Sequence, residues 1–108
     1  MILVVGKPSN WTALARALPR GVTLRFDPIE ALTPAHLREL KPDLVLSPLL
    51  GDGFDAVEVA QRLAKAGFQG RFRVVAPPLL NPEVVRAEVQ EAAEEIDFDL
   101  MVMGGRPH

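Results

Sequence analysis

Residues 42–63 read PDLVLSPLLGDGFDAVEVAQRL, and this stretch decides the fold. The apolar run 44–46 enters a loop that contains Pro48, Gly51 and Gly53, and a segment with helical periodicity follows from Asp55. A short apolar run, a turn and an amphipathic segment are typical of a buried strand that leads into a helix. The stretch therefore predicts the first half of a βαβ unit.

The same alternation continues on both sides of this stretch. Strands are predicted at residues 2–5, 22–26, 72–76 and 98–103, and further helices at 10–18, 34–41 and 81–96. Five strands that alternate with four helices imply an α/β fold with a doubly wound parallel sheet of order 2-1-3-4-5, which is flavodoxin-like. We expect one domain over residues 1–103, no helix after the last strand, and a flexible tail at 104–108.

Helix boundaries follow from capping residues. Thr33 and Asn81 each precede a proline, which predicts an N-cap followed by proline at the first helical position. Gly67 predicts a left-handed C-cap for the central helix. Trp11 is expected to pack in the core rather than to stack on a ligand.

Composition restricts the class of protein. The chain has 108 residues, no cysteine and a formal charge of −2. The acidic balance argues against a nucleic-acid surface, and no stretch approaches the roughly 18 apolar residues of a membrane span. The absence of cysteine excludes disulfides and thiolate metal sites, so we expect a cytoplasmic protein.

The central stretch resembles the response-regulator receiver domain. The scaffold residues that carry the resemblance are Pro42 and Asp43 before the strand, and Gly53, Asp55 and Val59 after it. It extends over nearly the whole chain, from Ile2 to residue 103, but only as a pattern outside the central stretch. The resemblance implies a receiver-like scaffold.

The same resemblance assigns positions to the phosphorylation chemistry of receivers. That family holds magnesium with an acidic pair after the first strand, phosphorylates an aspartate that ends the third, and ends the fourth with a hydroxyl residue and the fifth with a lysine. The matching positions here are Gly6 and Lys7, Pro48, Ala76 or Pro77, and Met103. The resemblance therefore implies a degenerate pseudo-receiver that lacks the phosphorylation residues.

The residues themselves lead to the same expectation. Magnesium prefers carboxylate oxygens, and the predicted ends of the first, third and fourth strands carry none. Asp52 and Asp55 are expected to serve a turn and a helix cap. Lys7 places a positive charge at the strand ends, so Lys7 and Ser47 are candidates for binding an anion. We expect no metal and no cofactor.

The sequence contains few of the residue combinations that enzymes use for catalysis. Ser9 and Ser47 have no histidine base, since His36 begins a helix and His108 lies in the tail. His36 and Glu39 have a spacing that metal sites use, but without a third ligand they are expected to be solvated surface. No GxGxxG motif follows the first strand, so a dinucleotide site is disfavoured as well.

Two features indicate protein partners. Seven of the chain's 14 acidic residues lie between Glu83 and Asp99. They form either a solvated helix face or a docking surface for a basic partner that includes Glu91, Glu94 and Glu95. Residues 100–103 are all apolar, and no later helix is expected to cover them. This predicts a homodimer through the surface near Met101 and Met103.

We therefore expect a phosphorylation-incompetent, receiver-like protein–protein interaction module in bacterial signal transduction. The alternative is a flavodoxin-like module that binds a small ligand or anion through Lys7 and Ser47. A purely structural role in an assembly stays open.

Overall fold

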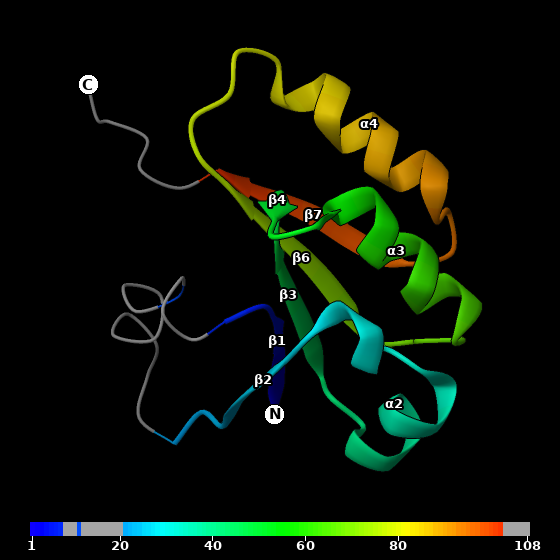
Figure 1. Cartoon of the computed structure of the whole chain (residues 1–108). Helices are drawn as coiled ribbons and strands as arrows, with labels where there is room; N and C mark the ends of the chain where they lie inside the picture. The colour runs from blue at the N-terminus through cyan, green and yellow to red at the C-terminus, as the bar shows by residue number, and fades with distance from the viewer. Residues whose placement is uncertain (8–10, 12–20, 103–108) are drawn as a thin grey trace.

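A computed structural model describes residues 1–7, 11 and 21–102, which form a parallel sheet covered on one face by helices (Figure 1). The strands of this sheet are β1 (Ile2–Val5), β2 (Leu24–Asp27), β3 (Leu44–Pro48), β6 (Arg71–Ala76) and β7 (Asp97–Val102). The helices are α2 (Pro34–Leu40), α3 (Ala56–Lys65) and α4 (Pro82–Ala92). Shorter elements are the 3-10 helix η2 (Ile29–Ala31) and the hairpin strands β4 (Leu50–Gly51) and β5 (Phe54–Asp55).

The strand order is β2-β1-β3-β6-β7, and every neighbouring pair is parallel. This confirms the predicted order 2-1-3-4-5. The β4–β5 hairpin, which the sequence did not predict, occupies the loop between β3 and α3. The predicted helix at 10–18, apart from Trp11, and the tail at 104–108 lie outside the described residues. None of the described helices is long and apolar enough to cross a membrane.

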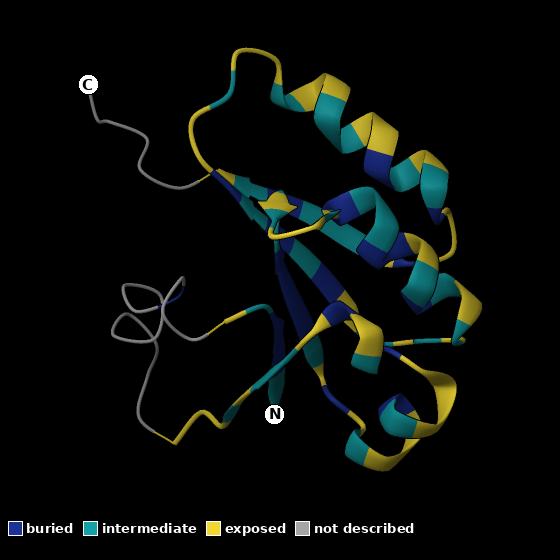
Figure 2. Ribbon diagram, in the orientation of Figure 1, coloured by how far each residue is buried: buried dark blue, intermediate teal, exposed yellow. Residues whose placement is uncertain are grey.

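Two of the three inner strands, β1 and β3, are buried on both faces, as parallel strands usually are (Figure 2). Leu3 and Val45 point into the large core beneath α2, α3 and α4. Val4 and Leu46 point to the opposite face, where they pack with Trp11. Trp11 is only 5% exposed, so its expected place in the core is confirmed.

The large core is closed by the apolar faces of the helices. Val59 and Leu63 of α3 are fully buried, and Val89 of α4 is almost fully buried. The ring of Phe72 in β6 is fully buried too, and its centroid lies 5.8 Å from that of Phe98 in β7. The large core thus lies between the helices and strands that include β3, β6 and β7.

The helices begin largely where the sequence predicts. The Thr33 hydroxyl accepts a hydrogen bond from the His36 amide at 3.2 Å, which caps α2. The Asp55 carboxylate accepts one from the Glu58 amide at 2.9 Å, which caps α3. Gly67 has a φ of 74°, so its left-handed conformation after α3 is confirmed. The side chain of Asn81 makes no capping hydrogen bond at the start of α4.

The end of α4 was predicted wrongly. The helix ends at Ala92 instead of near Ile96. The side-chain amide of Gln90 donates to the carbonyl oxygens of Ala93 and Ile96, each at 3.3 Å, and so holds a turn after the helix. Ile96 is still buried, but from that turn. Val22, predicted as the start of β2, lies before the strand and is exposed.

Phe72→Ala should lower the free energy of unfolding by about 3–5 kcal/mol, because it removes a fully buried ring from the contact with Phe98 and leaves a cavity. Urea unfolding followed by far-UV circular dichroism measures the change. Val22→Ala, at an exposed position, should change stability by less than about 0.5 kcal/mol. A loss below about 1 kcal/mol for Phe72→Ala would contradict the described core.

Candidate functional site at the carboxyl ends of the strands

A cavity of about 300 Å³ lies at the carboxyl ends of β1, β2 and β3, beside the β4–β5 hairpin. The chain winds from β1 to β2 on one side and from there to β3 on the other, so the winding direction reverses between β1 and β3. Open parallel sheets bind ligands at such a reversal point, beyond the carboxyl ends of the strands. The cavity therefore occupies the place where this fold class holds its ligands.

The wall of the cavity is mainly apolar. Phe26, Ile29, Pro48 and Phe54 line it from β2, η2, β3 and β5. The Phe54 ring lies against Gly51, because a Cβ atom built at Gly51 would be only 2.2 Å from its Cζ. Any side chain at position 51 would displace the ring. The hairpin thus places an aromatic wall that depends on glycine.

Backbone hydrogen bonds attach this hairpin to the sheet. The Leu49 amide donates to the Val75 carbonyl at 3.0 Å, and the Ala56 amide donates to the Leu49 carbonyl at 3.0 Å. Pro48 ends β3 just before these contacts, as expected of a residue without an N–H. The first bond attaches the base of the hairpin to β6 and the second closes it, which fixes the position of the wall made by Phe54.

The mouth of the cavity carries charges of both signs. Lys7 Nζ lies 4.0 Å from Asp52 Oδ2, and both side chains are largely exposed. Glu30 lines the cavity as well and is exposed. Gly6, with a φ of 124°, turns the chain toward Lys7, and its amide donates to the Asp27 carbonyl at 3.0 Å. The pairing at the mouth is weak, because exposed ion pairs gain little energy.

Asp27 lines the cavity and forms a small charged network with its neighbours. Its Oδ2 accepts hydrogen bonds from Arg25 Nε and contacts His36 Nε2, each at 2.9 Å. Burial acts to raise the pKa of Asp27, but the hydrogen bonds from His36 and Arg25 outweigh it and hold this pKa below its usual value. The expectation that His36 is solvated surface was wrong. Its side chain is 22% exposed and is paired with Asp27.

The predicted phosphorylation-site positions are brought together only in part. Gly6, Lys7 and Pro48 line the same cavity. Pro77 follows β6 as an exposed residue and does not line it. Met103 lies outside the described residues. Among the residues described, no group of three or more His, Asp or Glu side chains is placed to hold a metal ion.

The two predicted anion ligands are separated in the structure. Lys7 reaches the mouth, whereas Ser47 is fully buried and its hydroxyl donates to the Pro48 carbonyl oxygen at 2.8 Å. Ser47 shares the side of β3 that carries Val45, which faces the large core. Alternation along the strand could have shown this in advance, because Val45 and Ser47 are two residues apart. An anion site of Lys7 with Ser47 is therefore not formed.

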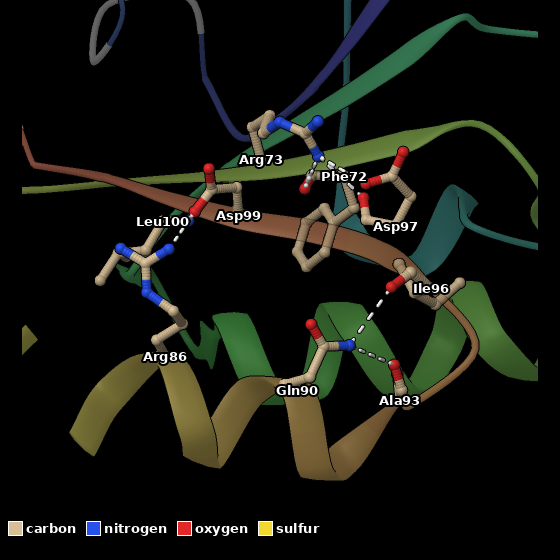
Figure 3. Close-up of polar contacts among 9 residues, drawn as sticks. All are labelled: Phe72, Arg73, Arg86, Gln90, Ala93, Ile96, Asp97, Asp99 and Leu100. Carbon is tan, nitrogen blue, oxygen red and sulfur yellow. Dashed lines mark hydrogen bonds and ion pairs between the residues drawn. The ribbon is translucent and has the colours of Figure 1, made fainter. Parts of the chain in front are cut away.

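The acidic segment near α4 also differs from expectation (Figure 3). Arg73 Nη1 donates to the Asp97 carbonyl at 2.8 Å and lies 3.4 Å from its carboxylate, and Arg86 of α4 pairs with Asp99. Two of the acidic residues are therefore neutralised by arginines. The exposed acidic surface consists of Glu83, Glu88, Glu91, Glu94 and Glu95. The last two lie in the turn after α4, so the expectation of a single helix face was wrong.

The last strand is less apolar than the sequence suggested. It begins at Asp97, and its residues alternate between Phe98 and Leu100 on the helix-covered side and Asp97, Asp99 and Met101 on the other. Met101 is half-buried beside Val75. The side of β7 that faces away from α4 is therefore charged at its amino end and apolar only near Met101. The expected continuous apolar patch is absent from the described part of this strand.

Comparison with solved structures matches the chain to the signal receiver domain of the protein described as response regulator NarL from Mycobacterium tuberculosis, with a TM-score of 0.69 and 16% identity. The match covers 97% of this chain and 85% of that one. The fold is that of a signal receiver domain. No protein-family model matches the sequence, and comparison with curated proteins finds no match. The receiver likeness is therefore one of structure.

Asp27→Asn should destabilise the protein at neutral pH, because it removes the carboxylate that binds Arg25 and His36. The pKa of Asp27 is lower in the folded state than in the unfolded state. Its stabilisation is therefore present above the unfolded value of about 3.9 and is lost as the pH falls through the folded pKa.

The difference in unfolding free energy between wild type and Asp27→Asn should consequently narrow below about pH 4. Urea unfolding at a series of pH values measures it. Asp52→Asn at the exposed mouth is the matched control and should change stability by less than about 0.5 kcal/mol. A difference that stays constant into acid would contradict the network.

Proposed function

We propose that the chain is a phosphorylation-incompetent, receiver-like module that acts by binding another protein in bacterial signal transduction, in the cytoplasm. The observation that carries this proposal is the composition of the strand ends, where Gly6, Lys7 and Pro48 line the cavity. In the receiver family, which the sequence resembles, these places hold the acidic pair and the phosphorylated aspartate.

The chemistry of phosphoryl transfer supports the proposal. The reaction requires a carboxylate nucleophile and oxygen ligands for a magnesium ion. The side chain of Pro48 has no nucleophilic atom, and the ammonium of Lys7 repels a divalent cation at the mouth. Asp27 lines the cavity as well, but its carboxylate is committed to Arg25 and His36. Asp52 lies on the exposed hairpin loop, where its nearest partner is Lys7.

The exposed acidic surface supports docking of a protein with a basic face. Its five glutamates lie on α4 and the following turn, and among them Glu83 is the one that contacts an arginine, Arg86 at 3.6 Å. Complementary charge mainly speeds association and selects the partner. A role in binding is therefore consistent with this surface.

We also propose that the chain forms a homodimer through the side of β7 that faces away from α4, near Met101. The side chain of half-buried Met101 provides an apolar contact there. A two-fold dimer is the commonest symmetric assembly. The charged residues Asp97 and Asp99 confine the apolar contact to the carboxyl end of the strand.

Incubation with acetyl phosphate and magnesium should leave the intact mass of the protein unchanged, because the described residues do not bring a carboxylate nucleophile together with ligands for a metal ion. Pro48→Asp alone should not restore phosphorylation, since Gly6 and Lys7 still deny the metal its ligands. Mass spectrometry of the native protein and this variant measures both. Stoichiometric addition of a phosphoryl group to the native protein would overturn the proposal.

Sedimentation velocity at tens of micromolar should show a dimer, and Met101→Lys should shift it to monomer while the circular dichroism spectrum is retained. The charge would be desolvated in the contact, which is unfavourable. Val22→Lys, at an exposed position before β2, is the control and should leave the dimer intact. A stable native monomer at this concentration would exclude the proposed self-association.

A further inference from the structure

We propose that the cavity at the carboxyl ends of β1, β2 and β3 binds a free aromatic amino acid. The proposal rests on the shape and charge of the cavity and is independent of protein docking by the acidic surface. The volume of about 300 Å³ is at the lower end of the range for ligand pockets. It accommodates a molecule the size of one amino acid.

The apolar wall of the cavity can bind an aromatic ring. Phe26 and Phe54 line the cavity together with Pro48, and aromatic rings pack favourably against such apolar surfaces. The Phe54 ring lies against Gly51 in a hairpin whose base is bonded to β6 and closed by a second backbone hydrogen bond. The ring site is thus formed before a ligand enters, which reduces the entropic cost of binding.

The charged residues at the mouth of the cavity can bind both charges of a zwitterion. Lys7 and Asp52 present opposite charges 4.0 Å apart, and Glu30 adds a second carboxylate at the rim. An α-amino acid carries its carboxylate and its ammonium on one carbon, so the two groups can pair with Lys7 and Asp52 at the same time. Because Lys7 and Asp52 are exposed and only weakly paired, each can turn toward the ligand at little cost.

Other small molecules fit less well. A simple anion would gain Lys7 but would lie beside the carboxylates of Asp52 and Glu30. A simple cation would gain these two carboxylates but would meet the ammonium of Lys7. A neutral hydrocarbon would pack against the apolar wall but would make no ion pair with the charged residues at the mouth. The combination of an apolar aromatic wall with a mouth of both charges therefore selects a zwitterion that carries a ring.

The single tryptophan provides a built-in reporter. A Cβ atom built at Gly6 would lie 3.5 Å from Trp11 Nε1, so the indole is next to a residue that lines the cavity. The protein should be titrated with L-phenylalanine, which does not absorb where tryptophan is excited. We expect a saturable change in Trp11 fluorescence, and isothermal titration calorimetry should give the same dissociation constant.

Comparison ligands separate the three parts of the recognition. L-alanine lacks the ring, 3-phenylpropionate lacks the ammonium and phenethylamine lacks the carboxylate. Because each compound loses one interaction, its dissociation constant should be at least about tenfold larger than that of L-phenylalanine. Equal affinity for L-phenylalanine and 3-phenylpropionate would overturn the assignment of a zwitterion site.

Variants test the named residues. Lys7→Gln and Asp52→Asn should each weaken L-phenylalanine binding about tenfold without a change in the unfolding midpoint. Phe54→Leu should weaken it by at least the same factor. Lys65→Gln, an exposed lysine on α3 away from the cavity, is the control and should bind as wild type does.

The proposal is overturned if L-phenylalanine gives no saturable signal by either method, or if Lys7→Gln and Asp52→Asn both bind it as wild type does. Should Phe54→Leu fail to fold, Gly51→Ala displaces the same ring and replaces it in the test. Phosphorylation of the protein by acetyl phosphate would contradict the proposed function alone, and the titration would still decide the ligand.

Discussion

Burial of β1 and β3 on both faces of the sheet is the constraint on which the other features depend. Val4 pairs with Leu46 in the parallel register, so the chain leaves the two strands side by side, at Gly6 and Pro48. A shift of one residue in either strand would turn its large-core residues toward the opposite face. In the observed register both strands end at the same edge of the sheet, and the cavity lies at this shared end.

Much of the fold could be predicted from the sequence because its signals are local. Apolar runs and helical periodicity predicted the strand order, and Thr33 and Gly67 marked a helix start and a helix end. The end of α4 could not be predicted in this way, since Gln90 holds the following turn through contacts with Ala93 and Ile96. The apolar periodicity continues to Ile96 because this residue is also buried in the core, although it lies in the turn after the helix.

The candidate site was only partly predictable for a related reason. Lys7 and Pro48 could be placed at the strand ends from topology. The wall could not, because it depends on the Phe54 ring lying against Gly51 within a hairpin of very short strands. The pairing of His36 with Asp27 joins residues on a helix and a strand, and no local pattern reveals it. Ser47 was misplaced although strand alternation was sufficient to assign its side.

The arginine contacts of β7 have a consequence for solubility. This strand is the last in the described sheet, and an edge strand exposes unpaired backbone groups onto which a strand from another molecule can add. Asp97 and Asp99 put charge along that edge, and Arg86 ties Asp99 to α4 (Figure 3). Sheet extension from one molecule to the next would require these ion pairs to break and their charges to be desolvated. The ion pairs that neutralise Asp97 and Asp99 thus also oppose aggregation through the β7 edge of the sheet.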